Sequence, residues 1–185
     1  MSSVKRATIC AFCIALCCVL PLAFHALGLG SAFSPMHIPA LLCGLLCGWP
    51  YGCLCGIAGP VLSCLISGMP APLQLVYFIP ELAVYGLVSG LLYARIRTGN
   101  RAADLYLALV PAMLAGRIAG GAAQAVLFTA TARAWSVGLW AAAYFAGTLP
   151  GTAAQLVLIP ALVTALERAR LIPARYPMKG EKTDA

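Results

Sequence analysis

Residues 36–67 read MHIPALLCGLLCGWPYGCLCGIAGPVLSCLIS, and this apolar run decides how often the chain crosses a membrane. A membrane-spanning helix needs about 20 apolar residues, so the run is too long for one span and short for two. Trp49 and Pro50 divide it, because proline ends or kinks a helix. Whether the run holds one span or two sets the side of the membrane on which every later loop lies.

The composition of the whole chain points to a lipid bilayer. Of its 185 residues, 62% are hydrophobic and 9% are charged, and the mean hydropathy is +0.94. A soluble domain has about 25% charged residues. Further apolar runs cover 7–29, 73–94, 103–130 and 138–166. The net charge is +7, but the basic residues flank these runs and form no patch with aromatic residues, so we expect no nucleic-acid partner.

The positions of the basic residues decide between one span and two in 36–67. With two spans and the N-terminus inside, only Arg133 lies outside, and Arg117 lies within the membrane. The residues then on the cytoplasmic side are Lys5, Arg6, Arg95, Arg97, Arg101, Arg168, Arg170, Arg175, Lys179 and Lys182. With one span, the loop 95–101 and the basic tail would face outside. The positive-inside rule favours two spans.

We therefore predict an all-α integral membrane protein with six transmembrane helices and both termini in the cytoplasm. Helices two and three are predicted to be short and joined by a turn at Gly48-Trp49-Pro50. Residues 1–174 form one membrane domain. The first run continues to about Gly30 and further spans follow, so we expect a first span and not a cleaved signal peptide. Residues 175–185 are polar and charged, which predicts a disordered cytoplasmic tail.

Two ionisable residues, Glu81 and Arg117, fall inside predicted spans, where charge is costly and marks function. Three helices carry polar or aromatic residues at helical spacings of three and four, which place them on one face. These stripes are Gln74, Tyr77, Glu81 and Tyr85; Arg117, Gly120 or Gly121, Gln124 and Phe128; and Tyr144, Thr148, Gly151 or Thr152, and Gln155. Because polar stripes avoid lipid, we expect the three faces to meet around a shared cavity. Ordinary hydrogen bonding between helices is the simpler alternative.

Depth along the helices predicts a pocket that opens to the outside. Counting about 1.5 Å per residue, Glu81 and Thr148 lie roughly 12 Å below the outer ends of their helices, and Gln124 about 9 Å. Arg117 and Gln155 lie about 20 Å down, near the midplane. Arginine near the floor suits a ligand with a carboxylate or phosphate. Glu81 would bind a donor on the ligand or hold Arg117, unless the two form an ion pair that only locks the helices.

Small residues are prominent in the predicted helices. Ala7, Ala11 and Ala15 recur every four residues on the first helix, a spacing that lets another helix approach closely. Glycine pairs with the same spacing suit internal packing. The cysteines are Cys10, Cys13, Cys17, Cys18, Cys43, Cys47, Cys53, Cys55 and Cys64. Nine is an odd number and all lie in apolar runs, so we interpret them as small hydrophobic residues and not as a disulfide framework. A thiol-lined path for a soft metal is the alternative.

With six helices, both ends inside and an Ala-x-x-x-Ala motif, the chain resembles the S components of energy-coupling factor (ECF) transporters, which are their substrate-binding membrane subunits. The similarity is to the vitamin-type S components and covers about residues 5–170. The stretch FSPMHIPALLCGLLCGWPYGCLCGIAGPVLSCLISGMP is similar to the first loop and helices two and three of that family. Its pattern is Pro-Ala-Leu-Leu-x-Gly, a glycine-aromatic turn and a second glycine-rich helix.

This resemblance implies a function that composition does not show. Such subunits capture a vitamin or related organic micronutrient near the outer face, at a site made by helices four to six and loops one and five. They dock through the alanine face of helix one, here Ala7, Ala11 and Ala15, onto a membrane-embedded coupling subunit that two ATPases power. The resemblance also implies the plasma membrane of a bacterium or archaeon. The substrate-binding residues we expect are His37, Gln74, Tyr77, Glu81, Tyr85, Arg117, Gln124, Tyr144, Thr148 and Gln155.

Met36-His37-Ile38-Pro39 is also similar to the start of nickel and cobalt S components, in which the free N-terminal amine helps to bind the metal. Here the motif is internal, and Met36 has only an amide nitrogen. Three roles stay open for His37: capping helix two and packing the first loop, contacting an organic ligand, or binding a metal together with His25. A metal site needs several well-placed ligands, and our leading hypothesis includes neither a metal nor a cofactor.

An enzyme and a channel are hypotheses from other classes. A rhomboid-like intramembrane protease needs a Ser or Cys nucleophile against a histidine deep in the membrane. Both histidines are predicted near the outer surface, and no Gly-x-Ser-x-Gly motif is present. The polar stripes stop short of the cytoplasmic ends, which favours a blind pocket over a pore. Without a Walker A motif, the chain is predicted to be a transporter subunit that relies on partner ATPases.

Overall fold

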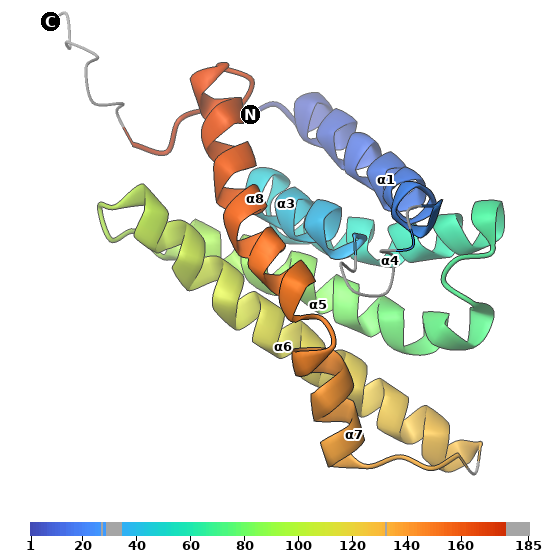
Figure 1. The fold of residues 1–185 in the computed structure, drawn as a ribbon. Coiled ribbons are helices and arrows are strands. Elements are labelled where there is room, and N and C mark those ends of the chain that lie inside the picture. Colours follow the sequence, from blue (N-terminus) through green and yellow to red (C-terminus); the bar gives the residue numbers. More distant parts are fainter. Residues whose placement is uncertain (27, 29–34, 132, 177–185) are drawn as a thin grey trace, which may run out of the picture.

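In the computed structural model, every regular element among the described residues is a helix (Figure 1). The structure describes the whole chain apart from residues 27, 29–34, 132 and 177–185. The helices are α1 (Ser3–Ala26), α3 (His37–Cys47), α4 (Trp49–Ser67), α5 (Pro72–Arg95), α6 (Arg101–Ala130), α7 (Val137–Ala141), the π-helix η1 (Ala142–Ala146) and α8 (Leu149–Arg168). This arrangement agrees with the predicted all-α class.

The run 36–67 divides where the sequence predicts. α3 ends at Cys47, α4 begins at Trp49, and Gly48 between them has φ 92°. This left-handed region favours glycine, and Pro50 suits the first turn of α4, where its missing N–H needs no partner. The prediction that both helices are short is right only for α3, which has 11 residues; α4 has 19.

Five described helices are long and apolar enough to cross a membrane: α1, α4, α5, α6 and α8. The chain is thus a multi-pass helical membrane protein, and a sixth span, which would have to include the short α3, stays a prediction. Each of the five long helices also contains an internal proline, at Pro21, Pro60, Pro80, Pro111 and Pro160. A proline inside a helix leaves backbone groups without their usual hydrogen bonds, and neighbouring helices in a bundle can supply other partners for these groups.

The last apolar run, 138–166, is not one continuous helix. α7 passes into the π-helix η1, a turn follows at Gly147 and Thr148, and α8 begins at Leu149. Pro150 cannot donate a backbone hydrogen bond to the preceding turn, and Gly147 is a poor helix former, so the local sequence accounts for the break. The break separates Tyr144 from the polar residues of α8.

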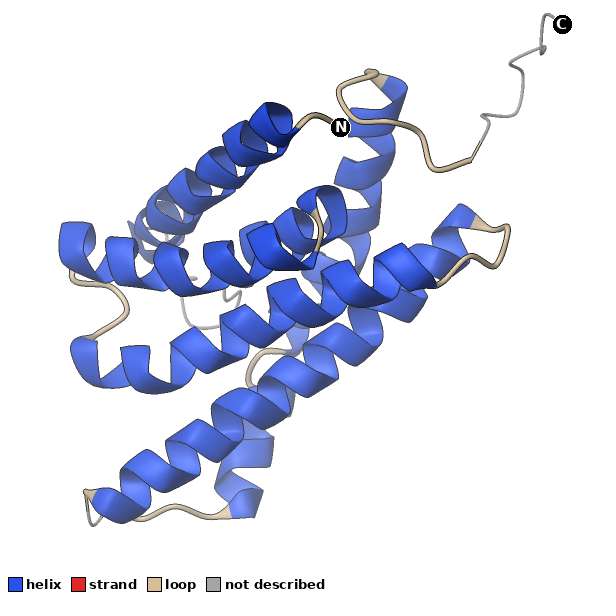
Figure 2. Ribbon diagram, turned by 180° about the vertical axis from the view of Figure 1, so that it is seen from behind, coloured by secondary structure: helices blue, strands red, loops and turns tan. Residues whose placement is uncertain are grey.

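α5 is the central helix and lies between α4 and α6 (Figure 2). Glycines make this packing close. A Cβ at Gly52 would meet the backbone of Gly86, and one at Gly56 would meet the backbone of Leu82. A Cβ at Gly44 on α3 would also meet Gly86. The predicted internal role of these glycines is confirmed: they let helix backbones approach, as small residues do in membranes.

α1 has two distinct faces. Cys10, Cys13 and Cys17 are buried and pack with cysteines of α3 and α4 in one apolar cluster. Their thiols bond to backbone oxygens: Cys10 Sγ donates to the Tyr51 carbonyl at 3.5 Å, and Cys17 Sγ to that of Met36 at 3.8 Å. On the other face, the three alanines of the predicted docking motif are exposed.

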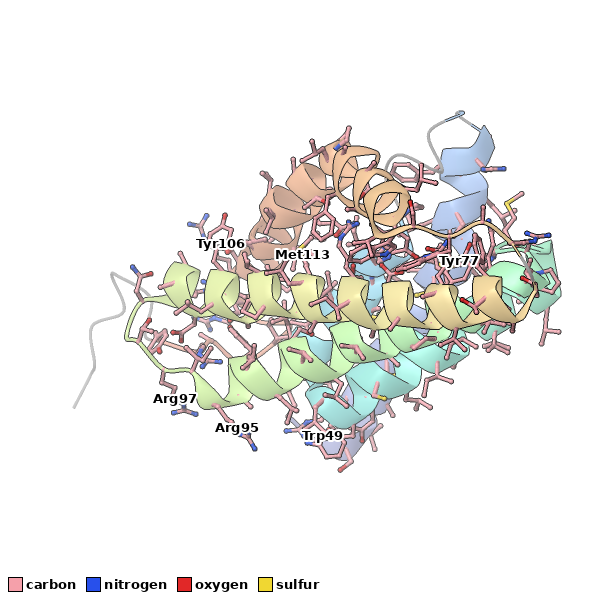
Figure 3. The ribbon with its side chains drawn as sticks, turned by 90° about the horizontal axis from the view of Figure 1, so that it is seen from below. Trp49, Tyr77, Arg95, Arg97, Tyr106 and Met113 are labelled. Carbon is pink, nitrogen blue, oxygen red and sulfur yellow. The ribbon has the colours of Figure 1, made fainter. Side chains whose placement is uncertain are left out.

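The N-terminus, the α5–α6 loop and the segment after α8 lie at one end of the molecule. Met1, Lys5, Glu167 and Arg170 line one cavity of about 410 Å³. Figure 3 shows Arg95 and Arg97 at this end, far from Tyr77. These three segments carry most of the basic residues that are predicted to be cytoplasmic, and they lie together in the structure. Which side of the membrane this end faces remains a prediction.

Asp104 joins the segments at this end through hydrogen bonds. Its side chain is fully buried and accepts hydrogen bonds from Thr98 N and Oγ1 at 2.8 and 2.7 Å, from Arg175 Nε at 2.8 Å and from Tyr176 OH at 2.7 Å. The Arg175 guanidinium also lies 4.0 Å from the Tyr93 ring centroid. The predicted disordered tail 175–185 thus begins with two residues that are packed; the rest of it, 177–185, lies outside the described residues.

Candidate functional site

A cavity of about 680 Å³ opens at one end of the molecule. This end lies opposite the end that holds the N-terminus, the α5–α6 loop and the segment after α8. The walls of the cavity come from the C-terminal part of α1, the start of α3, the N-terminal half of α5, the second half of α6 and η1, and from the segments that precede α3, α5 and α8. The lining residues are Pro21, His25, Pro35, Met36, His37, Gly68, Met69, Pro70, Ala71, Gln74, Tyr77, Phe78, Glu81, Arg117, Gln124, Ala143, Tyr144 and Thr148. The three stripes predicted from the sequence therefore contribute to one cavity.

Glu81 is the acidic group of the cavity and is 2% exposed. Its Oε1 accepts a hydrogen bond from Tyr85 OH at 3.1 Å and lies 3.2 Å from His37 Nε2. Room for it comes from α6, because a Cβ at Gly120 would lie 2.8 Å from Oε2 and 2.9 Å from the Glu81 Cβ. A buried carboxylate is thus held on one oxygen, while the other lies against Gly120.

His37 is the first residue of α3 and is buried. Its ring centroid lies 5.0 Å from that of Tyr85 and 6.2 Å from that of Phe78. Met36 occupies the N-cap position without a side-chain cap, and His37 Nε2 faces Glu81 instead of the helix end. The described contact with Glu81 adds to the three roles left open for His37, and the choice among them stays a prediction.

His25 lines the same cavity but is exposed near the end of α1. Across the described part of the chain, no three His, Cys, Asp or Glu side chains are arranged to hold a metal ion. Among the described residues, no third His, Cys, Asp or Glu therefore completes a metal site with His25 and His37.

Arg117 is the cationic group of the cavity and is 5% exposed. Its Nη2 donates to Thr152 Oγ1 of α8 at 3.0 Å. Its guanidinium carbon lies 6.0 Å from the Tyr144 ring centroid and 5.6 Å from that of Phe145, both within the range of cation–π attraction. Thr152 and the two η1 rings thus hold Arg117 in place and leave most of its N–H groups for other partners.

Glu81 and Arg117 are held by different side chains, apart from Tyr144, which lies near both. Among the residues that the structure describes, Glu81 Oε1 lies 3.2 Å from His37 Nε2, and no salt bridge joins Glu81 to Arg117. The hypothesis that the two charges only lock helices together through a mutual salt bridge is therefore not supported. Instead, one cavity contains two buried groups of opposite charge.

Two predicted residues line the cavity but also make local structural hydrogen bonds. Gln74 Oε1 accepts from the Ala71 N–H at 3.2 Å at the start of α5. Thr148 Oγ1 donates to the Tyr144 carbonyl at 2.6 Å in the turn before α8. These hydrogen bonds occupy side-chain oxygens that were predicted to bind the ligand.

Tyr85 and Gln155 do not line the cavity. Tyr85 is fully buried behind Glu81, in a space that a Cβ at Gly116 would fill. Gln155 is 1% exposed, and its Oε1 is buried without a hydrogen-bond partner. Both share a helical face with lining residues, but neighbouring helices cover them.

Sequence reasoning missed several residues of the site. Met36 and Phe78 form part of the apolar wall of the cavity, and the Phe145 ring lies beside the Arg117 guanidinium. Such residues are common throughout this chain, so composition offers no signal for them. Thr152 was noted on the α8 stripe, but nothing local indicated that it would be the partner of Arg117.

Residues 5–172 match the family model described as ECF transporter, substrate-specific component. Comparisons with curated proteins and with solved structures gave no match.

Proposed function

The chain belongs to the substrate-specific components of ECF transporters, and from this we propose that it captures a vitamin or related small organic micronutrient that carries an acidic group. The observation that carries the proposal is Arg117: a buried guanidinium that lines a cavity and makes one hydrogen bond to protein among the described residues. Arginine has five N–H donors in a planar fork that matches a carboxylate or phosphate.

The size and lining of the cavity support an organic ligand. Its volume of about 680 Å³ lies within the range of roughly 300–1,000 Å³ that is usual for small-molecule sites. Most lining residues are apolar or aromatic, with a few polar groups among them. Such a lining suits a molecule with an apolar or ring body and a small number of polar ends.

Substrate-specific components work with a coupling subunit and ATPase subunits. We propose that the exposed alanine face of α1, formed by Ala7, Ala11 and Ala15, is the surface that meets the coupling subunit in the plasma membrane of a bacterium or archaeon. A helix can approach this face closely because its side chains are small.

The experiment that tests the function is native mass spectrometry of the full chain in mild detergent, with the released ligand identified by small-molecule analysis. We expect an organic acid bound to the wild-type protein and lost from Arg117→Ala. The matched control is Arg133→Ala, because Arg133 is exposed and does not line the cavity.

Two outcomes would contradict the proposal. One is a nickel or cobalt ion in place of an organic acid. The other is equal retention of the acid by the Arg117→Ala variant, which would remove Arg117 from the site. If the protein is purified empty, a thermal-shift screen with vitamins and these two metals replaces the direct identification.

A further inference from the structure

We infer that the ligand carries two groups: an acid that binds Arg117 and a nitrogen donor, either an ammonium or a ring N–H, that binds Glu81. The inference rests on the proposed function and narrows its substrate class. It follows from two buried groups of opposite charge that line one cavity and are not joined by a salt bridge among the described residues.

The Glu81 end is built to accept a donor. Oε1 already accepts from Tyr85 and lies within hydrogen-bond distance of His37, and Tyr144 also lies close to this carboxylate. A carboxylate has about four acceptor sites, so it can accept a further donor from a ligand. A carboxylate is an acceptor only, so a second acid at this end would be repelled, whereas an N–H group would be bound. Because Glu81 is 2% exposed, water can do little to replace a missing donor.

The Arg117 end has the opposite requirement. It is 5% exposed and uses one of its N–H groups for Thr152. The two aromatic rings beside it offer π faces but no strong acceptor. A ligand carboxylate or phosphate would satisfy the remaining donors bidentately, whereas a cationic group would be repelled.

The wall near Glu81 favours a ring as the carrier of the nitrogen. Tyr77 and Phe78 both line the cavity, with ring centroids 5.5 Å apart. Aromatic side chains stack on planar groups, so a ring placed against them can direct its N–H toward Glu81. A ligand that lacks either polar end loses a hydrogen bond to a buried charged group, which costs about tenfold in affinity or more.

The test is a binding panel on the full wild-type chain in detergent, measured by isothermal titration calorimetry. Folic acid and biotin have both an acid and ring N–H groups. Pantothenate has an acid without a nitrogen ring, and riboflavin and thiamine have nitrogen rings without a carboxylate. We expect folic acid or biotin to bind most tightly, by at least tenfold over the one-group compounds.

Variants then separate the two ends. Glu81→Gln keeps the size of the side chain, and Gly120→Ala introduces a Cβ where the Glu81 carboxyl lies. Both should weaken binding of the two-group compound by tenfold or more while the melting temperature shows a folded protein. Gly138→Ala is the matched control, because a Cβ there meets nothing within 4 Å.

Two results overturn the inference. If pantothenate, riboflavin or thiamine binds most tightly, the two-group class is wrong although a micronutrient function stands. If Glu81→Gln leaves the affinity for the two-group compound unchanged, the nitrogen end is wrong. Absence of binding by every compound would count against the proposed function as well.

Discussion

Single charged residues decide much of this structure, because a charge inside an apolar bundle must find a partner. Glu81 has His37 and Tyr85, Arg117 has Thr152, and Asp104 has Arg175. An isolated charge in such surroundings would cost several kcal/mol. Apart from Tyr85, which lies four residues from Glu81 on α5, these partners come from distant parts of the chain, so the contacts also join separate segments.

The Asp104–Arg175 contact leads to a prediction about stability. Arg175→Met removes the charged partner of a fully buried carboxylate. We expect the free energy of unfolding to fall by about 3 kcal/mol, the scale for breaking a buried ion pair by removing one partner. Chemical unfolding in detergent measures the loss.

Arg97→Met is the control for this experiment, because Arg97 is exposed in the nearby α5–α6 loop. Equal stability of the Arg175→Met variant and the wild type would show that the contact contributes little. Ligand affinity should hardly change in either variant, since the cavity lies at the other end of the molecule.

At the scale of whole elements, α1 shows how one helix serves two surfaces. Residues at helical spacing share a face: its cysteines pack inward against α3 and α4, and its alanines face outward. Thiols are small enough for close helix packing and can donate to backbone oxygens. The outward alanine face is left for a partner or for lipid.

A bulky substitution on the alanine face of α1 tests whether a partner subunit or lipid covers this face. Ala11→Trp should stop uptake by the assembled transporter but leave ligand binding by the isolated chain unchanged, because the side chain points away from the core. Radiolabelled uptake in vesicles and calorimetry on the purified chain give the two readings. Undiminished uptake would show that α1 does not dock through this face.

Ile66→Trp serves as the control for this variant. Ile66 is 71% exposed near the end of α4, so a tryptophan there changes an apolar surface outside the proposed interface. Uptake should continue in this variant. Loss of uptake in both variants would instead point to a general effect of surface tryptophans.

At the scale of the whole molecule, the segments that carry most of the basic residues lie at one end of the fold. The N-terminal segment, the loop after α5 and the segment after α8 come together there, with Arg101 and Glu167 paired at 2.6 Å. The cavity opens at the other end. If the positive-inside rule sets the orientation, the cavity faces the medium from which a nutrient is captured.

Cysteine labelling tests this orientation. Arg97→Cys in a variant without the nine native cysteines should react with a membrane-impermeant maleimide in inside-out vesicles and not in right-side-out vesicles. Leu139→Cys, on α7 near the cavity end and 67% exposed, should show the reverse. The opposite labelling pattern would place the termini outside and overturn the predicted topology.

The sequence predicts those parts of the site that depend on the helical period alone. Glu81, Arg117, Gln124 and Tyr144 lie at the cavity because spacing places them on polar faces and polar faces avoid lipid. Tyr85 and Gln155 have the same spacing, yet other helices cover them. Spacing shows which residues share a face but not how deeply a neighbouring helix covers that face.

Composition, length and backbone preference act locally, and they are enough to predict the membrane class, most of the helices and the division at Gly48. The partner of each buried charge depends on tertiary packing. Glu81 meets His37 from 44 residues away, and Arg117 meets Thr152 from 35 residues away. Such pairs depend on how the helices rotate and approach, which the glycines of α4, α5 and α6 permit but do not specify.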